Sequence, residues 1–240
     1  MKNPNGPYPG RQLFLGLTVD GNPALAYLVT GRSPKSRERT GIAINDEIRM
    51  GPLGDQLYDP LRHYTAVKYD NTNGMAIVSN GIQTEAIFET YRLLYNVETP
   101  PGESYIKMIM DGADAEPDSL KTPRISGVIT KNNAETEPIF ILSIKTNNTP
   151  AMGYRVKPEH GKMTGISTYK GDLENPEAFD QNSDLAILEL NEKTPKGIAE
   201  YLYNISEASH QGDDIRVCAI GGVCQKDNIW NLEILNRHET

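Results

Sequence analysis

The chain has little cysteine and lacks both a long apolar run and an excess of positive charge. Only Cys218 and Cys224 occur, and an extended strand would hold them about 20 Å apart, beyond disulfide reach. We therefore expect buried free thiols, as is typical of a reducing compartment. No apolar run is long enough to cross a bilayer, and the N-terminal residues contain no apolar segment typical of a secretory signal. These absences predict a cytoplasmic protein without a membrane partner.

Negative charge predominates, with 32 Asp and Glu against 24 Lys and Arg and a net charge of −8. A nucleic-acid partner requires a broad positive surface that releases counterions, so we expect none. The four histidines are scattered without the spacing of metal ligands, and no glycine-rich dinucleotide or P-loop motif occurs. The sequence therefore indicates neither a metal site nor a cofactor.

Three arginines nevertheless lie within eight residues, at Arg32, Arg37 and Arg39, beside Ser33 and Ser36. Guanidinium forks match the oxygens of phosphate or carboxylate, and neighbouring hydroxyls add short donors. This run predicts a pocket for one small anion. The alternative interpretation is a solvated basic loop.

Short strand-like runs joined by turn residues make up most of the chain. Ten runs are predicted to be strands, at residues 13–19, 24–30, 64–69, 75–79, 125–130, 139–144, 163–169, 186–190, 217–223 and 230–235. Apolar residues at helical spacing after Thr84 predict a helix that packs against a sheet. Thr194 followed by Pro195 predicts a capped helix start, and residues 103–110 form a weaker helical segment. The pattern favours a mostly antiparallel α+β fold in one domain, residues 1–240.

Four segments place polar groups beside the ends of predicted strands, where loops usually carry binding sites. They comprise residues 8–11, residues 31–33 with Arg37, residues 78–81 and residues 121–125. Together they predict one converging pocket. Taken singly, Asn80-Gly81 is an ordinary turn and residues 121–124 are an ordinary charged entry to a strand.

These segments resemble the archaeal-type IMP cyclohydrolases and their bacterial relatives. The matching positions are Tyr8-x-Gly10-Arg11, Ala26-Tyr27, Arg32-Ser33-x-x-x-Arg37, Tyr64, Val78-Ser79-Asn80-Gly81 with Thr84, and Thr122-Pro123-Arg124-Ile125. The resemblance implies the last step of purine synthesis, in which a formamido-imidazole-carboxamide ribonucleotide closes its ring to inosine monophosphate and loses water. It also implies a four-layer αββα sandwich similar to N-terminal-nucleophile hydrolases, and a homo-oligomer such as a tetramer.

The resemblance assigns catalytic roles to Arg37, Tyr64 and Glu116. Arg37 is expected to polarise the formyl or carboxamide oxygen, while Tyr64 and Glu116 move protons, with roles that could be exchanged. The residues expected to bind the purine mononucleotide are Arg11, Arg32, Ser33, Asn80, Lys121, Thr122 and Arg124.

Two other functions remain open at this point. A non-catalytic module that binds a purine mononucleotide would keep the arginine pocket without the proton chemistry. An amide hydrolase of the same fold class would need a reactive N-terminal residue. Met1 precedes Lys2, and no glycine is followed by Ser, Thr or Cys, so we expect no exposed N-terminal nucleophile.

Overall fold

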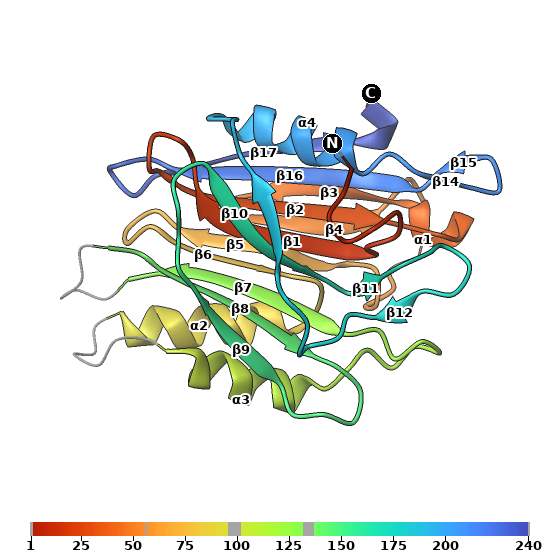
Figure 1. Cartoon of the computed structure of the whole chain (residues 1–240), viewed down its shortest axis with the longest axis horizontal. Helices are drawn as coiled ribbons and strands as arrows, with labels where there is room; N and C mark the ends of the chain where they lie inside the picture. Colours follow the sequence, from red (N-terminus) through yellow and green to blue (C-terminus); the bar gives the residue numbers. More distant parts are fainter. Residues whose placement is uncertain (1, 56, 96–101, 132–136, 240) are drawn as a thin grey trace.

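The computed structural model of the protein describes residues 2–55, 57–95, 102–131 and 137–239 (Figure 1). The fold is α+β, with two large antiparallel sheets and few helices. Within these ranges, no helix combines the length and the apolar character needed to cross a membrane.

The first sheet has six strands, and each neighbouring pair is antiparallel. Its order across the sheet is β13 (Ala186–Glu189), β10 (Lys162–Ser167), β1 (Arg11–Leu17), β2 (Pro23–Thr30), β16 (Arg216–Cys224) and β17 (Trp230–Asn236). Helix α4 (Pro195–Ile205) packs on this sheet through Ile198, Ala199 and Leu202. Thr194 caps the helix by accepting a hydrogen bond from the Gly197 backbone N–H.

The second sheet has seven strands in the order in which they occur along the chain. They are β3 (Arg39–Ile44), β4 (Glu47–Pro52), β5 (Tyr64–Asp70), β6 (Met75–Ser79), β7 (Arg124–Thr130), β8 (Ile139–Lys145) and β9 (Met152–Val156). Helices α2 (Gln83–Leu94) and α3 (Glu103–Ala113) pack against this sheet, with Ile87, Tyr91 and Ile106 buried. Figure 1 shows α2 and α3 together on the outer face of the second sheet and α4 beside β16, and contacts place α2 on β5 and β6 and α3 on β8 and β9.

The two sheets share the largest hydrophobic core. Leu13 and Leu15 of β1 face Val78 and Ile129 of the second sheet in this core. A Cβ atom at Gly127 would lie 3.1 Å from Cδ1 of both leucines, so the missing side chain allows the sheets to approach closely. The interior between the sheets is therefore tightly filled.

Small elements gather near the start of β1. They are α1 (Pro34–Arg37), the pair β11 (Tyr169–Lys170) and β12 (Glu177–Ala178), the pair β14 (Ser209–His210) and β15 (Asp213–Asp214), and a terminal 3-10 helix η1 (Arg237–Glu239). The segment from β10 to β11 continues its antiparallel pairing with the chain at the start of β1, since the Thr168 and Tyr169 backbone N–H groups donate to the carbonyls of Arg11 and Pro9. Several separate segments thus meet at one end of the sandwiched sheets.

Most of the sequence-based prediction of elements is confirmed. Each of the ten predicted strands overlaps an observed strand, and the three predicted helices are α2, α3 and α4. The elements that were not predicted are strands β3, β4 and β9, the two-residue strands β12, β14 and β15, helix α1 and the 3-10 helix η1. In β3 the inward residues are Arg39 and Gly41, whereas Ile42 is exposed, so the usual apolar-inward pattern is absent. Both cysteines are free and buried, as expected.

Candidate active site

A buried ion pair links the start of β1 to the loop between α3 and β7. The Nη2 atom of Arg11 lies 2.5 Å from Oε1 of Glu116, and Glu116 is only 2% exposed. Burial lowers the pKa of Arg11, but the charge and hydrogen bond of Glu116 act together with the interactions with Tyr64 and Tyr27 and raise that pKa well above its ordinary value. The pair therefore holds a carboxylate and a permanent cation together away from water.

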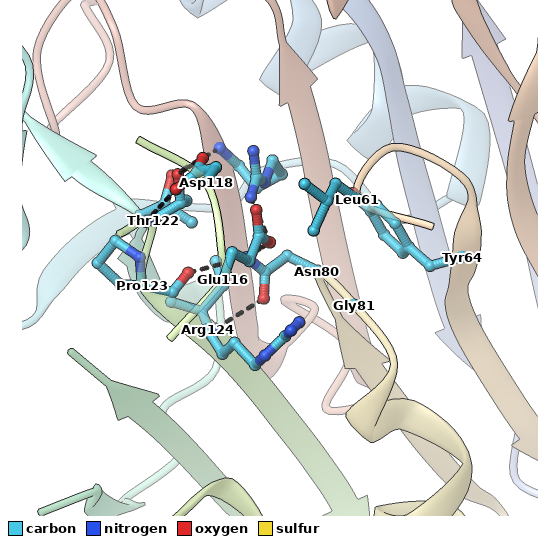
Figure 2. Close-up of polar contacts among 12 residues, drawn as sticks. Leu61, Tyr64, Asn80, Gly81, Glu116, Asp118, Thr122, Pro123 and Arg124 are labelled. Carbon is cyan, nitrogen blue, oxygen red and sulfur yellow. Dashed lines mark hydrogen bonds and ion pairs between the residues drawn. The ribbon is translucent and has the colours of Figure 1, made fainter. Parts of the chain in front are cut away.

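Asn80 fixes this carboxylate against the second sheet (Figure 2). Its Nδ2 donates to Oε1 of Glu116 at 3.1 Å and to the carbonyl of Pro123 at 2.9 Å. Its Oδ1 accepts the backbone N–H of Ile125 at 2.8 Å. Asn80 is fully buried, so the side chain acts as a bridge from β6 to β7 rather than as an exposed turn residue.

Arg124 begins β7 and points toward the same cluster (Figure 2). Its Nη1 donates to Oε1 of Gln83 at 3.3 Å, and burial lowers its pKa. A Cβ atom at Gly81 would lie 2.2 Å from Nη1 of Arg124, so only glycine leaves room for this guanidinium. Nε of Arg11 and Nε of Arg124 have no hydrogen-bond partner among the described residues. Both are buried donors available to an anionic ligand.

Thr122 lies at the edge of the cluster. Its hydroxyl donates to Asp118 at 2.5 Å and lies 2.5 Å from the hydroxyl of Tyr169. Burial raises the pKa of Tyr169 to about 12. Lys121 is exposed and adopts a positive φ of 49°, so its side chain does not join this buried network.

A pair of tyrosine hydroxyls spans the two sheets. The hydroxyls of Tyr27 on β2 and Tyr64 on β5 lie 2.8 Å apart. Burial raises the pKa of Tyr64, while the positive charges of Arg39 and Arg11 oppose that rise. Burial also raises the pKa of Tyr27, well above its ordinary value. Tyr64 therefore keeps its proton at neutral pH and lies within the field of two cations.

The arginine cluster of the sequence occupies a neighbouring place with different partners. Nη2 of Arg37 pairs with Asp213 at 2.6 Å, and its Nη1 donates to the carbonyl of Arg32 at 2.7 Å. Nη1 of Arg32 donates to the carbonyls of Leu173 and Glu174, both at 2.9 Å. Ser33 caps α1 by accepting the backbone N–H of Ser36. Arg37 is 5% exposed, whereas the side chain of Asp213 is 63% exposed.

The structure thus brings most of the expected site residues into one cluster, composed of Arg11, Tyr64, Asn80, Glu116, Thr122 and Arg124. It places Arg32, Ser33 and Arg37 at α1 and leaves Lys121 exposed. The sequence assigned no site role to Tyr27, Gln83, Asp118 and Tyr169, although Tyr27 stood in a matching motif. Arg39 was predicted only as part of the arginine run that forms a pocket for a small anion, and nothing in the run indicated that its side chain would be buried between the sheets.

The chemistry open to this cluster is proton transfer and stabilisation of negative charge. A buried carboxylate and a buried phenol can each exchange a proton, and guanidinium groups stabilise charge that develops on oxygen. In the described ranges, no group of His, Cys, Asp and Glu is arranged to hold a metal ion. Met1, on which the expectation about an N-terminal nucleophile depends, lies outside the described residues.

Known proteins are similar to this chain over most of its length. Residues 8–228 match the family described as IMP cyclohydrolase-like protein. The chain is 29% identical to the IMP cyclohydrolase of Methanocaldococcus jannaschii over 224 residues, which cover 92% of this chain and 96% of that protein. It is 34% identical to the IMP cyclohydrolase of Methanococcus maripaludis strain S2 over 166 residues, which cover 68% of this chain and 75% of that protein. The chain therefore belongs to the IMP cyclohydrolase-like family.

Proposed function

We propose that this protein is an IMP cyclohydrolase, a hydrolase that acts on carbon–nitrogen bonds in cyclic amidines. In the biosynthetic direction it closes the ring of 5-formamidoimidazole-4-carboxamide ribonucleotide to inosine monophosphate and releases water. The observation that carries the proposal is the buried cluster in which Glu116 and Tyr64 lie within the electrostatic field of Arg11. The relatives that match most of the chain bear the same name.

Ring closure sets two demands on the site. The carboxamide nitrogen is a weak nucleophile, so the enzyme gains most by holding it against the formyl carbon. The new C–N bond places negative charge on the formyl oxygen, which must be stabilised. One proton then leaves the attacking nitrogen and one leaves the former formamide nitrogen, and both end on the departing water. A site for this reaction needs a proton acceptor, a proton donor and cations.

Tyr64 and Glu116 are suited to the two proton transfers. A phenol with a raised pKa remains protonated at neutral pH, so Tyr64 can donate to the departing oxygen. Glu116 can accept a proton from nitrogen, because its Oε1 is held by Arg11 and Asn80 at the cluster. We thus propose Tyr64 as the proton donor and Glu116 as the proton acceptor, which is one of the two assignments that the sequence left open.

Arg37 retains the proposed role of polarising the formyl or carboxamide oxygen. Its guanidinium pairs with Asp213, whose carboxylate is mostly exposed. An exposed carboxylate returns to water at little cost, so a substrate oxygen can replace it on Arg37. Arg32 and Ser33 adjoin Arg37 and are proposed to bind the 5′-phosphate with Lys121. Arg11 and Arg124 contribute buried donors to the base or carboxamide, with Asn80 and Thr122 beside them.

We also propose the layer architecture, the oligomeric state and the cellular location of the protein. The packing of α4 on one sheet and of α2 and α3 on the other supports a four-layer αββα sandwich similar to N-terminal-nucleophile hydrolases, formed by residues 1–240 as a single domain. We propose a cytoplasmic homo-oligomer, such as a tetramer. Light scattering of the purified protein tests the oligomeric state, and a monomeric mass would contradict it.

A turnover assay tests the activity directly. Purified protein given the formamido ribonucleotide without added metal should produce the absorbance of inosine monophosphate. Arg37→Ala should lower kcat about 100- to 1000-fold, as for loss of one oxyanion donor. Arg92→Ala removes an exposed arginine from α2 and serves as the matched control. No conversion by the intact protein would reject the proposal, and tight nucleotide binding with no effect of Glu116→Gln or Tyr64→Phe would favour a binding module.

A further inference from the structure

Arg39 is a buried charged side chain at the edge of the candidate site. It is 2% exposed, as is Glu116, and it is the largest of the almost completely buried side chains in the described ranges. Its Nε and Nη1 have no hydrogen-bond partner among the described residues. Within the described ranges its one hydrogen bond is long, at 3.4 Å from Nη2 to the carbonyl of Thr30. A guanidinium has five N–H donors, so most of its donor capacity is unused.

The direction of this side chain follows from the register of β3. Residues two apart on a strand point to the same face, so Arg39 and Gly41 share a face. A Cβ atom at Gly41 would meet Ile234 and Asn236 of β17, with Cys218 of β16 at 3.8 Å. Arg39 therefore points into the space between the two sheets, where the Tyr27–Tyr64 hydroxyl pair lies.

No carboxylate balances this charge within the described part of the chain. The Arg11 guanidinium pairs with Glu116 and that of Arg37 pairs with Asp213, but no ion pair involves Arg39. The titratable groups that feel its charge are Tyr27, Tyr64, Cys218 and His63. Burying an unpaired cation is costly, and an apolar residue of similar size would be the more stable choice. Arg39 is thus poorly explained by stability alone.

We propose that Arg39 is a positioning residue for ring closure, acting through the Tyr27–Tyr64 hydroxyl pair to make Tyr64 a better proton donor. This inference rests on the proposed cyclohydrolase activity. The two hydroxyls lie 2.8 Å apart and either can be the donor. In the proposed arrangement Tyr27 donates to the Tyr64 oxygen, which leaves the Tyr64 hydrogen for the substrate. When Tyr64 gives that proton to the departing oxygen, the phenolate that forms is stabilised by Arg39 and by Arg11.

The remaining groups around Tyr64 are consistent with this role. Arg39 from β3 and Arg11 from β1 both lower the pKa of Tyr64 against the larger effect of burial, and Glu116 raises it slightly. Arg11 is already neutralised by Glu116 at 2.5 Å, whereas Arg39 has no counter-charge in the described ranges. Arg39 is therefore the cation whose field remains available to the phenolate. A proton lost by a substrate nitrogen restores the Tyr64 hydroxyl, so the two protons that leave the nitrogens equal the two that the departing water carries away.

Steady-state kinetics test the proposal with Arg39→Met, which removes charge at similar length. We expect kcat to fall about 10- to 100-fold with KM changed less than twofold. The alkaline limb of the kcat profile should move to higher pH by about one unit, because loss of a nearby cation raises the pKa of Tyr64. Arg39→Lys should recover part of the loss, and Arg49→Met, at an exposed position on β4, should behave as wild type. A rise in KM alone would instead make Arg39 a substrate-binding group and overturn the proposal.

A double-mutant comparison tests whether the effect passes through Tyr64. In a Tyr64→Phe background, Arg39→Met should change kcat less than twofold, because the proton donor is already absent. An undiminished loss in that background would overturn the proposal. The melting temperature of Arg39→Met should equal or exceed that of wild type. A fall of more than a few degrees, or failure to fold, would assign Arg39 to structure and equally overturn the proposal.

One measurement does not depend on turnover. Fluorotyrosine placed at position 64 reports its own ionisation by fluorine NMR, and the midpoint should rise in Arg39→Met relative to the parent protein. An unchanged midpoint refutes the coupling. If wild-type protein fails to convert the formamido ribonucleotide while this midpoint still moves, the proposed function fails and the coupling between Arg39 and Tyr64 stands.

Discussion

Asn80 connects three segments of the candidate active site, and its replacement by alanine should lower both stability and turnover. The side chain donates to Glu116 and to the carbonyl of Pro123, and it accepts from the backbone N–H of Ile125 and from Gln83. Asn80 is completely buried. Alanine removes all four contacts at once and introduces no group that could replace them.

The magnitude follows from the groups left without partners. The backbone N–H of Ile125 loses the 2.8 Å bond to Asn80, and the carbonyl of Pro123 loses a bond of 2.9 Å. Leaving a buried donor or acceptor unsatisfied costs about 1–3 kcal/mol, so two such groups lower the free energy of unfolding by about 4 kcal/mol. For a chain of this size, that corresponds to a fall in melting temperature of about 10 °C. Glu116 also loses a donor that orients its carboxylate, so kcat should fall about tenfold.

Urea unfolding followed by circular dichroism measures the free energy of unfolding, and the cyclohydrolase assay measures kcat. Asn182→Ala is the matched control, because Asn182 is exposed and contacts only Asp180 in the described ranges. Its free energy of unfolding should change by less than about 0.5 kcal/mol. A loss below about 1 kcal/mol in Asn80→Ala, with unchanged kcat, would refute the bridging role and restore the interpretation of Asn80-Gly81 as an ordinary turn.

Three further perturbations probe other parts of the site. Asp213→Asn removes the exposed partner of Arg37, so steady-state kinetics should show that KM falls about two- to fivefold. Thermal unfolding should show a change in the free energy of unfolding of less than about 1 kcal/mol. A raised KM would contradict the proposal that substrate replaces Asp213 on Arg37. Gly81→Ala places a Cβ atom 2.2 Å from Nη1 of Arg124 and should lower kcat/KM about tenfold or more. If the variant instead kept the kcat/KM of the wild type, the guanidinium could move without loss of activity. Burial raises the pKa of the Cys218 thiol to about 12, so a disulfide reagent at pH 8 should leave it unmodified until the protein unfolds. In the unfolded chain this thiol ionises near pH 9, whereas in the folded protein it stays protonated until about pH 12. Ionisation therefore favours the unfolded state as pH rises from 9 toward 12, and the free energy of unfolding falls by up to about 1.4 kcal/mol per pH unit.

The elements that the sequence predicted are those in which local and long-range preferences agree. Helix α4 begins at a Thr-Pro cap and presents Ile198, Ala199 and Leu202 on one face, so its start and its buried side are both encoded locally. Strand β16 is a continuous apolar run and is buried on both faces. Strand β9 carries Gly153 and Arg155 within five residues, and its pairing with β8 depends on contacts made after the chain has turned back. Its strand character is therefore set by its neighbour.

The site could be predicted in part, because polar motifs at strand ends do converge. Arg11, Asn80 and Arg124 lie at the ends of β1, β6 and β7, and the antiparallel order of the sheets brings these ends together. Glu116 had no such signal, since an acidic loop usually leaves its carboxylates in water. Its burial results from the ion pair with Arg11 and from the Glu116 N–H bond to the Thr122 carbonyl, and the first of these joins segments far apart in the sequence. Only the family resemblance singled it out beforehand.

Strand β3 shows how a missed prediction can itself indicate function. Its exposed positions include Ile42 and Ile44, while Arg39 and Gly41 face the interior between the sheets. A pattern selected for stability alone would place the apolar residues inward and the charge in water. Where a strand reverses this rule beside Tyr64, the proposed proton donor, the buried charge is better explained by the chemistry we propose for it than by the fold it weakens. The same reasoning applies to Glu116, whose burial raises the cost of folding but places a carboxylate at the position where, in the proposed mechanism, a nitrogen loses its proton.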